Sequence, residues 1–304
     1  MVFLMEFQDI RIKINKSKSI GRVVYVVEGE RKEFTLLNHI FTKVFDYTFV
    51  EVKRKNNISN IEVFEKYESK ININSEIYVI NTKNSNISSI ENGDDYLNKI
   101  FTILFEKYGL EPNKASIYYI FDRDKGSNDE KIIMELISKL KNSKDNDINP
   151  NGLLLLSYPC VESFIVSCFK EQCDKLEIKS KNIKEYLKKE KINQDQIKDA
   201  NIEKSCLEMV KNIYELITYN LDMKDIDDFE EINSELFNKQ EAYYDENKRY
   251  SILSLLAISF LDLGILEFEW LTNSSRLFIK SWFYCFNVYV IFIAVRLIFF
   301  VNSL

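Results

Sequence analysis

Histidine is almost absent from this sequence, and cysteine, glycine and proline are sparse: the chain has one histidine, five cysteines, seven glycines and three prolines. The single histidine, His39, argues against serine–histidine and cysteine–histidine catalysis and against histidine-rich metal sites. The cysteines form no Cys-x-x-Cys pair, which argues against a zinc site and indicates reduced thiols in a cytoplasmic protein. Any catalysis is therefore expected to use carboxylates and a metal ion.

Basic residues do not outnumber acidic ones. The 304 residues carry a formal net charge of −6, which argues against a protein that coats nucleic acid electrostatically but allows an enzyme with a local basic strip. Hydrophobic residues make up 46% of the chain, enough for a sizeable core.

The stretch Ile117–Asp124 predicts a buried strand that ends in two aspartates. Five apolar or aromatic residues run directly into Asp122 and Asp124. Ligands of open parallel α/β sheets bind just beyond the carboxyl ends of such strands. Alternate residues of an extended chain point the same way, so both carboxylates can face one site. An acidic turn after an ordinary strand is the alternative, because aspartate is common in turns.

A second apolar run, Val23–Val27, ends in Glu28 and Gly29. The glycine is expected to allow a tight turn with unusual backbone angles into a helix. If the two strands are neighbours, Glu28 converges with the aspartates, and three unpaired carboxylates would repel each other strongly. A hard divalent cation, Mg²⁺ or Mn²⁺, is the usual solution.

These motifs resemble the Toprim domain of topoisomerases, primases and OLD-family nucleases, and more closely its RloB-like branch. That branch carries Glu-Gly-x-x-x-Glu, a strand ending Phe-Asp-Arg-Asp, and a later Ser-Asn-Pro-Cys-Phe-Glu-like motif. The matching residues here are Glu28-Gly29 with Glu33, then Phe121–Asp124, and then Ser157–Glu162. They occur in the family's order over about half the chain. Tyr158 and Val161 depart from the third motif.

The resemblance implies a metal-dependent nuclease. Glu28 would be a general acid/base or metal ligand, Asp122 and Asp124 would be Mg²⁺ ligands, and Glu33 and Glu162 would be further acidic members of the site. Glu162 has an equally simple explanation, since the helix dipole favours an acidic residue in a first helical turn. Basic residues beside the carboxylates are candidates for holding phosphate, although exposed basic side chains are usually just solvated: Arg31, Lys32, Arg123 and Lys125.

Strand-like and helix-like segments alternate through the first half of the chain, which predicts an α/β fold. We expect a Toprim-like, mainly parallel sheet flanked by helices, formed by residues 1–175 with an insertion at about 46–75. Residues 176–275 predict a helical extension, and 276–304 form a hydrophobic tail.

The tail has three interpretations. Residues 277–301 are almost wholly apolar and aromatic, and a spanning helix needs about 20 such residues. A membrane anchor, a buried terminal element and a frameshifted coding end all fit this composition.

Two functions from different classes remain open at this point. The first is a Mg²⁺-dependent nuclease acting on DNA or RNA in prokaryotic defence against phage or foreign DNA. The second is a non-catalytic Toprim-fold binding or regulatory module, anchored at a membrane through the tail. Either could work with a partner ATPase or by self-association.

Overall fold

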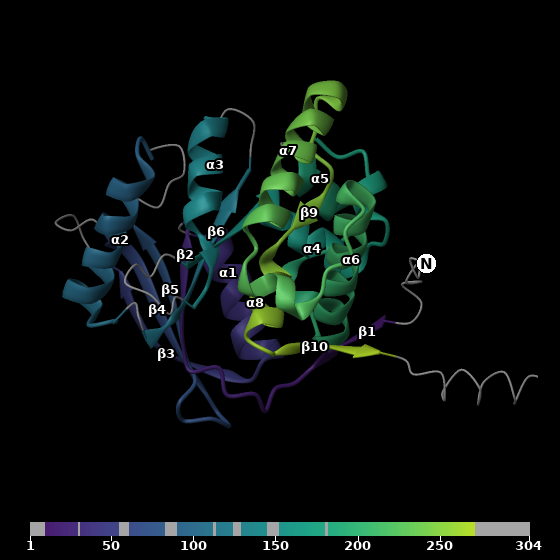
Figure 1. The fold of residues 1–304 in the computed structure, drawn as a ribbon. Helices are drawn as coiled ribbons and strands as arrows, with labels where there is room; N and C mark the ends of the chain where they lie inside the picture. Colours follow the sequence, from purple (N-terminus) through teal and green to yellow (C-terminus); the bar gives the residue numbers. More distant parts are fainter. Residues whose placement is uncertain are drawn as a thin grey trace, which may run out of the picture. The chain divides into compact units, whose positions relative to one another are not determined.

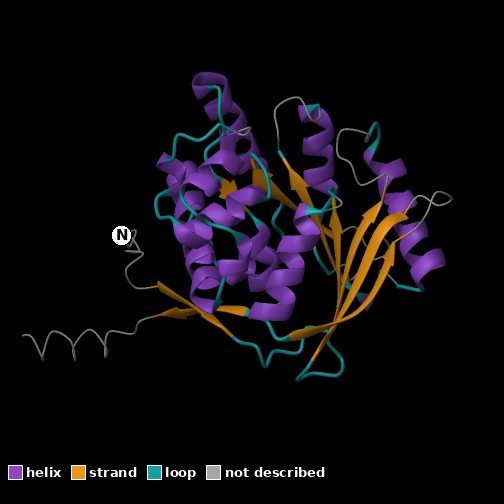
Figure 2. Ribbon diagram, turned by 180° about the vertical axis from the view of Figure 1, so that it is seen from behind, coloured by secondary structure: helices purple, strands orange, loops and turns teal. Residues whose placement is uncertain are grey.

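A mixed sheet of eight strands organises the molecule, in the order β3-β4-β5-β2-β6-β8-β7 with β9 beside β8 (Figures 1 and 2). The computed structural model describes residues 10–29, 31–54, 61–82, 90–111, 114–123, 129–144, 152–179 and 182–270. The strands of this sheet are β2 (Arg22–Val27), β3 (Tyr47–Arg54), β4 (Ile61–Ser69), β5 (Glu76–Thr82), β6 (Ser116–Asp122), β7 (Lys141–Asn142), β8 (Gly152–Tyr158) and β9 (Leu253–Ser254).

The four central strands, β5, β2, β6 and β8, are parallel. Each contains an uninterrupted apolar or aromatic run: Ile77–Ile80, Val23–Val27, Ile117–Phe121 and Leu153–Leu156. Burial explains these runs, because Val24, Tyr119 and Leu154, among others, are at most 1% exposed. Hydrophobic residues on both faces are typical of parallel strands covered by helices on either side. The expectation of an α/β sheet with flanking helices is confirmed, although the remaining strands make the sheet mixed rather than mainly parallel.

The predicted insertion is an antiparallel hairpin. Strand β3 pairs with β4, and β4 pairs with β5, so that the hairpin extends the parallel strands at one edge of the sheet. The stretch Ile61–Tyr67, whose sequence fits either a strand or a short helix, lies in strand β4.

Helices connect and cover the strands. They are α1 (Lys32–His39) continuing into a π-helical turn η2 (Ile40–Val44), α2 (Gly93–Tyr108), α3 (Glu130–Lys139), α4 (Glu162–Phe169), α5 (Ile183–Lys189), α6 (Asp199–Ile217), α7 (Glu230–Asn247) and α8 (Leu256–Asp262), with short 3-10 turns η6 (Cys173–Lys175), η8 (Gln194–Gln196) and η9 (Met223–Asp227). Helices α3 and α8 both contact β8, and α7 contacts α3 and α6 (Figure 1).

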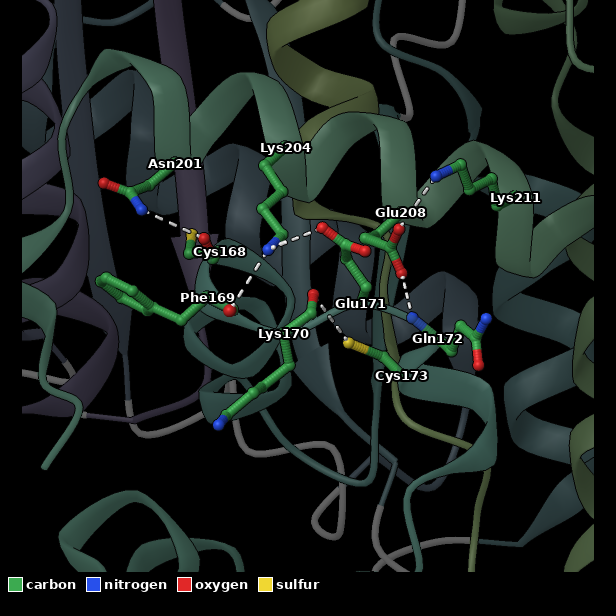
Figure 3. A network of polar contacts seen from close by, with 10 residues as sticks. All are labelled: Cys168, Phe169, Lys170, Glu171, Gln172, Cys173, Asn201, Lys204, Glu208 and Lys211. Atoms are coloured by element: carbon green, nitrogen blue, oxygen red, sulfur yellow. Dashed lines mark hydrogen bonds and ion pairs between the residues drawn. The ribbon is translucent and has the colours of Figure 1, made fainter. Parts of the chain in front are cut away.

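The described helices of the predicted helical extension (176–275), called the helical region below, pack against the α/β core. Residues 12–267 form one compact unit. Side chains of α6 satisfy the carbonyls at the C-terminal end of α4, which would otherwise lack partners. The amide of Asn201 donates to Cys168 O at 3.1 Å, and Lys204 Nζ donates to Phe169 O at 3.3 Å (Figure 3). Glu208 Oε2 accepts the backbone N–H of Gln172 at 2.7 Å.

Two further strands form a separate pair, β1 (Ile10–Ile14) with β10 (Leu266–Trp270). The alternating Ile10, Ile12 and Ile14 are typical of a strand such as the first of them. In the part of the chain that the structure describes, no helix combines the length and hydrophobicity that crossing a membrane requires. The hydrophobic segment 277–301 lies outside the described residues.

Gly152, at the start of β8, has a backbone conformation that other residues adopt only with strain, with φ at +103°. A Cβ at this position would lie 2.8 Å from Tyr119 Cε2 and 3.0 Å from Ile117 O. We therefore expect Gly152→Ala to lower the free energy of unfolding by about 2–4 kcal/mol, because strain and overpacking add. Chemical denaturation would measure this.

Gly109→Ala is the matched control, since Gly109 also has a positive φ, +61°, but open space around its Cβ position. Its cost should stay near 1–2 kcal/mol, the approximate strain of a left-handed residue alone. Equal losses in the two variants would contradict the packing argument.

Candidate active site at the carboxyl edge of the sheet

The acidic residues predicted from the sequence lie where the chain reverses its direction across the sheet. From β2 the chain leads to β5 on one side, and from β6 it leads to β8 on the other. The carboxyl ends of β2 and β6 therefore flank a topological switch point, the usual ligand position in open α/β sheets. Glu28 follows β2, and Asp122 ends β6.

Glu28 and Asp122 are in contact. The backbone N–H of Asp122 donates to Glu28 Oε2 at 3.3 Å. The prediction that these two residues meet at one edge of the sheet is confirmed. Asp124 and Lys125, the other predicted members on this loop, lie outside the described residues.

The third motif brings the end of β8 to the same place. The backbone N–H of Val161 donates to Asp122 Oδ1 at 2.7 Å, and the N–H of Arg123 donates to Ser157 O at 2.8 Å. Glu162 begins α4 and is 7% exposed. Its Oε1 forms an ion pair with Lys32 Nζ at 2.7 Å, while its Oε2 is buried with no hydrogen-bond partner in the described part of the chain.

Glu33 lies against the glycine that follows Glu28. The φ of Gly29 is not in the left-handed range, so the expectation of unusual backbone angles is wrong. Instead, a Cβ on Gly29 would collide with the carboxylate of Glu33, which folds back over this residue from the first turn of α1. The glycine permits this close approach of side chain to backbone.

Burial and neighbouring carboxylates raise the pKa of Asp122 and of Glu33. Burial, followed by the charges of Glu33 and Glu28, raises the pKa of Asp122 well above its usual range, against the opposing Val161 hydrogen bond. Burial also raises the pKa of Glu33, where Lys32 opposes and Glu162 adds to the effect. Four carboxyl groups from three motifs thus share one electrostatic environment.

Among the described residues, Lys32 forms an ion pair with this cluster through Glu162. Although burial acts to lower it, the pKa of Lys32 is raised by the hydrogen-bonded carboxylate of Glu162, with smaller effects from Cys160 and Asp122. Arg31 is exposed beside the site. Both residues thus remain candidates for contacting a phosphate.

The side chain of Arg123 does not lie where its sequence position, beside the predicted acidic residues, suggested. Its side chain is 1% exposed and forms two hydrogen bonds to Glu241 of α7, from Nε at 2.8 Å and from Nη2 at 3.0 Å. A guanidinium held in this way is not available to a phosphate at the surface. Glu241 is likewise buried, although its segment, Glu241–Asn247, has the acidic composition typical of a solvated helix face.

The donor chemistry of the cluster suits a hard divalent cation, because it consists of carboxylates and includes a buried oxygen without a partner. As the side chains lie in this structure, backbone N–H groups bind one oxygen each of Glu28 and Asp122, and Lys32 binds one oxygen of Glu162. Among the described residues, no three acidic, histidine or cysteine side chains are grouped so that they could hold a metal ion.

Asn81 is a site residue that the sequence reasoning missed. It is 2% exposed in β5, and its amide donates to Val27 O at 3.0 Å and to Glu28 O at 2.6 Å. It thereby fixes the backbone that carries Glu28. The signal was present, because Asn81 directly follows the apolar run Ile77–Ile80, but only carboxylates were considered at strand ends.

The raised pKa of Asp122 makes a prediction about stability. A carboxyl whose pKa rises on folding favours the folded state below its unfolded pKa, about 3.9, and this contribution is lost as the pH rises toward the folded pKa. In chelator-containing buffer at pH 7, we expect Asp122→Asn to melt about 2–4 °C higher than the parent, equivalent to about 1 kcal/mol. The difference should disappear near pH 4.

Glu235→Gln, on the exposed face of α7, should change the melting temperature at neither pH. A lower melting temperature for Asp122→Asn at pH 7 would show that the carboxylate is stabilised rather than strained by its surroundings.

Removing the Asn81 amide should destabilise the fold. Asn81→Ala leaves two backbone carbonyls without this donor, one of the two bonds being fully buried, at an expected cost of about 1–3 kcal/mol by urea denaturation. Asn142→Ala is the control, since it breaks a solvent-exposed bond to Asp227 O that water can replace, and it should cost less than about 0.5 kcal/mol. Similar losses would contradict the role assigned to Asn81.

Comparison with known proteins adds no further assignment. No family model matches the sequence, and no curated protein or solved structure matches it either. The functional interpretation therefore depends on the three motifs and on the geometry described above.

Proposed function

We propose that this chain is a metal-dependent nuclease of RloB-like Toprim type, hydrolysing phosphodiester bonds of DNA or RNA. The contact between Glu28 and Asp122 at the switch point is the observation that carries the proposal. Glu33 and Glu162, the acidic residues of the other matched positions, lie within electrostatic range of the same aspartate. An acidic turn after an unrelated strand would not account for this convergence.

The residues that would hold the ion are Glu28, Asp122 and Asp124, with Glu33 and Glu162 as further candidates. A bound Mg²⁺ or Mn²⁺ would neutralise charge developing on the phosphate and activate a water molecule. Residues of the chain itself position the ligands: Val161 N–H orients Asp122, and Asn81 fixes the backbone at Glu28. Glu28 is the candidate general acid/base.

The basic residues have two roles in this proposal. Lys32 balances part of the negative charge through Glu162, and together with Arg31 it supplies positive charge beside the carboxylates. Electrostatic attraction of this kind can hold a phosphate while the rest of an acidic protein repels nucleic acid. This local arrangement reconciles the net charge of −6 with a nucleic-acid substrate.

Hydrolysis is favoured over the other reactions of Toprim proteins. The sequence contains nothing that resembles a topoisomerase tyrosine region or a primase zinc module. A role in prokaryotic defence against phage or foreign DNA follows from the resemblance to the RloB-like branch.

The second candidate is a Toprim-fold binding or regulatory module without catalysis. Its support is the ion pair between Glu162 and Lys32, which compensates part of the acidic charge with a side chain of the protein itself. The two candidates differ in whether a divalent cation produces cleavage.

A nuclease assay on single- and double-stranded DNA and RNA, with Mg²⁺, Mn²⁺ or EDTA, tests the proposal. We expect cleavage of at least one substrate with a divalent cation and none with EDTA. Asp122→Asn should reduce the rate about 10²- to 10³-fold, because an amide keeps the shape of the side chain but lacks the charge.

Glu235→Gln should cleave at the parental rate, which controls for general loss of acidic charge. Undiminished cleavage by Asp122→Asn would exclude this carboxylate as an essential ligand. Absence of cleavage by the parent with every substrate and metal would favour the non-catalytic module.

A further inference from the structure

The residue after Asp122 is held by the helical region. Arg123 is buried at the start of the loop, and its guanidinium forms two bonds to the carboxylate of Glu241, 118 positions later in the sequence. The guanidinium carbon also lies 5.4 Å from the centre of the Phe237 ring, one helical turn before Glu241 on α7. Because Glu241 binds the edge of the guanidinium and the Phe237 ring covers its face, the guanidinium has little freedom to rotate.

Glu241 is itself fixed. The hydroxyl of Tyr250 donates to Glu241 Oε1 at 2.8 Å, and the Tyr250 ring packs against Tyr158 with the centroids 5.7 Å apart. Tyr158 ends β8, three residues before the Val161 N–H that binds Asp122. The segment from α7 to Tyr250 therefore contacts both loops that determine where the Asp122 carboxylate lies.

Stability alone does not explain such an arrangement. Removing two charges from water is costly, and apolar residues of similar volume often stabilise a protein as well as a buried ion pair does. What an ion pair with two parallel bonds adds is a defined direction. Here the ion pair holds the backbone next to Asp122 in one orientation. The N–H of Arg123 in that backbone also donates a hydrogen bond to Ser157 O.

We propose that Arg123 and Glu241 are positioning residues of the candidate active site, through which α7 sets the geometry of Asp122. This inference rests on the proposed function for its catalytic consequence, but the positioning itself can be measured without any activity. It assigns a role to the helical region, which the sequence left without one.

The test replaces both charges together, as Arg123→Met with Glu241→Met, so that no charge stays buried alone. We expect the melting temperature to fall by no more than about 8 °C, because the apolar pair fills a similar volume but leaves the Tyr250 hydroxyl without its acceptor. Residue-resolved hydrogen exchange should show the Val161 amide exchanging at least about tenfold faster, with the amides of β2 unchanged. Nuclease activity should fall about 10²-fold, as for a small displacement of a reacting group.

The control is the double replacement Arg249→Met with Glu177→Met. It removes an ion pair of the same region in which Glu177 is 78% exposed, and it should alter neither exchange at Val161 nor activity. If the first double variant does not fold, Arg123→Lys serves instead, since it keeps the charge but cannot form two parallel bonds. Faster Val161 exchange is expected there too.

Parental exchange at Val161 in a folded variant would overturn the positioning role. If the parent shows no metal-dependent cleavage but the variant shows faster Val161 exchange, the positioning role stands and the nuclease function fails. The two failures are therefore distinguishable.

Discussion

Repulsion among carboxylates at the end of buried parallel strands is the constraint on which the arrangement of this molecule depends. Two of these carboxylates, Glu28 and Asp122, lie at strand ends, and two more, Glu33 and Glu162, lie in the first turns of helices. The charges of Glu28, Glu33 and Glu162 all act on Asp122. Such a cluster persists in a folded protein only when donors and positive charges around it compensate the repulsion. Backbone N–H groups of Asp122 and Val161 and the ammonium of Lys32 do so here.

The compensation requires rigid surroundings, because an N–H donor helps only when its direction is fixed. The buried strands provide the first part, since the parallel pairing of β2 with β6 sets the distance between Glu28 and Asp122. Asn81 adds a second fixed point by binding two carbonyls at the end of β2. The Arg123–Glu241 pair adds a third, from a helix far away in the sequence.

Much of this could be predicted from the sequence, and the reasons for success and failure are physical. Uninterrupted apolar runs such as Val23–Val27 identify parallel strands because burial on both faces leaves no room for polar residues. The meeting of Glu28 and Asp122 follows from two strand ends at one sheet edge. Neither inference needs any contact between distant segments beyond strand pairing itself.

Arg123 shows where this reasoning fails. Its position beside Asp122 suggested a phosphate ligand, but its side chain turns to Glu241, and no local pattern links the two residues. The role of Gly29 was misassigned for a similar reason, because the backbone angles of an isolated turn do not reveal which side chain will lie against it. Local sequence patterns describe strands well and long-range side-chain partners poorly.

The separation of Arg123 from Glu241 along the chain also has a consequence for biosynthesis. At about 5–20 residues per second, the 118 residues between the two partners take on the order of 10 s to synthesise. Glu28, Glu33 and Asp122 are present when that interval begins and Glu162 is added within it, but the nascent chain lacks a complete α7 until the interval has ended. The Arg123–Glu241 pair therefore forms only after α7 has left the ribosome, so the contact that holds the backbone beside Asp122 is among the later ones to form during synthesis.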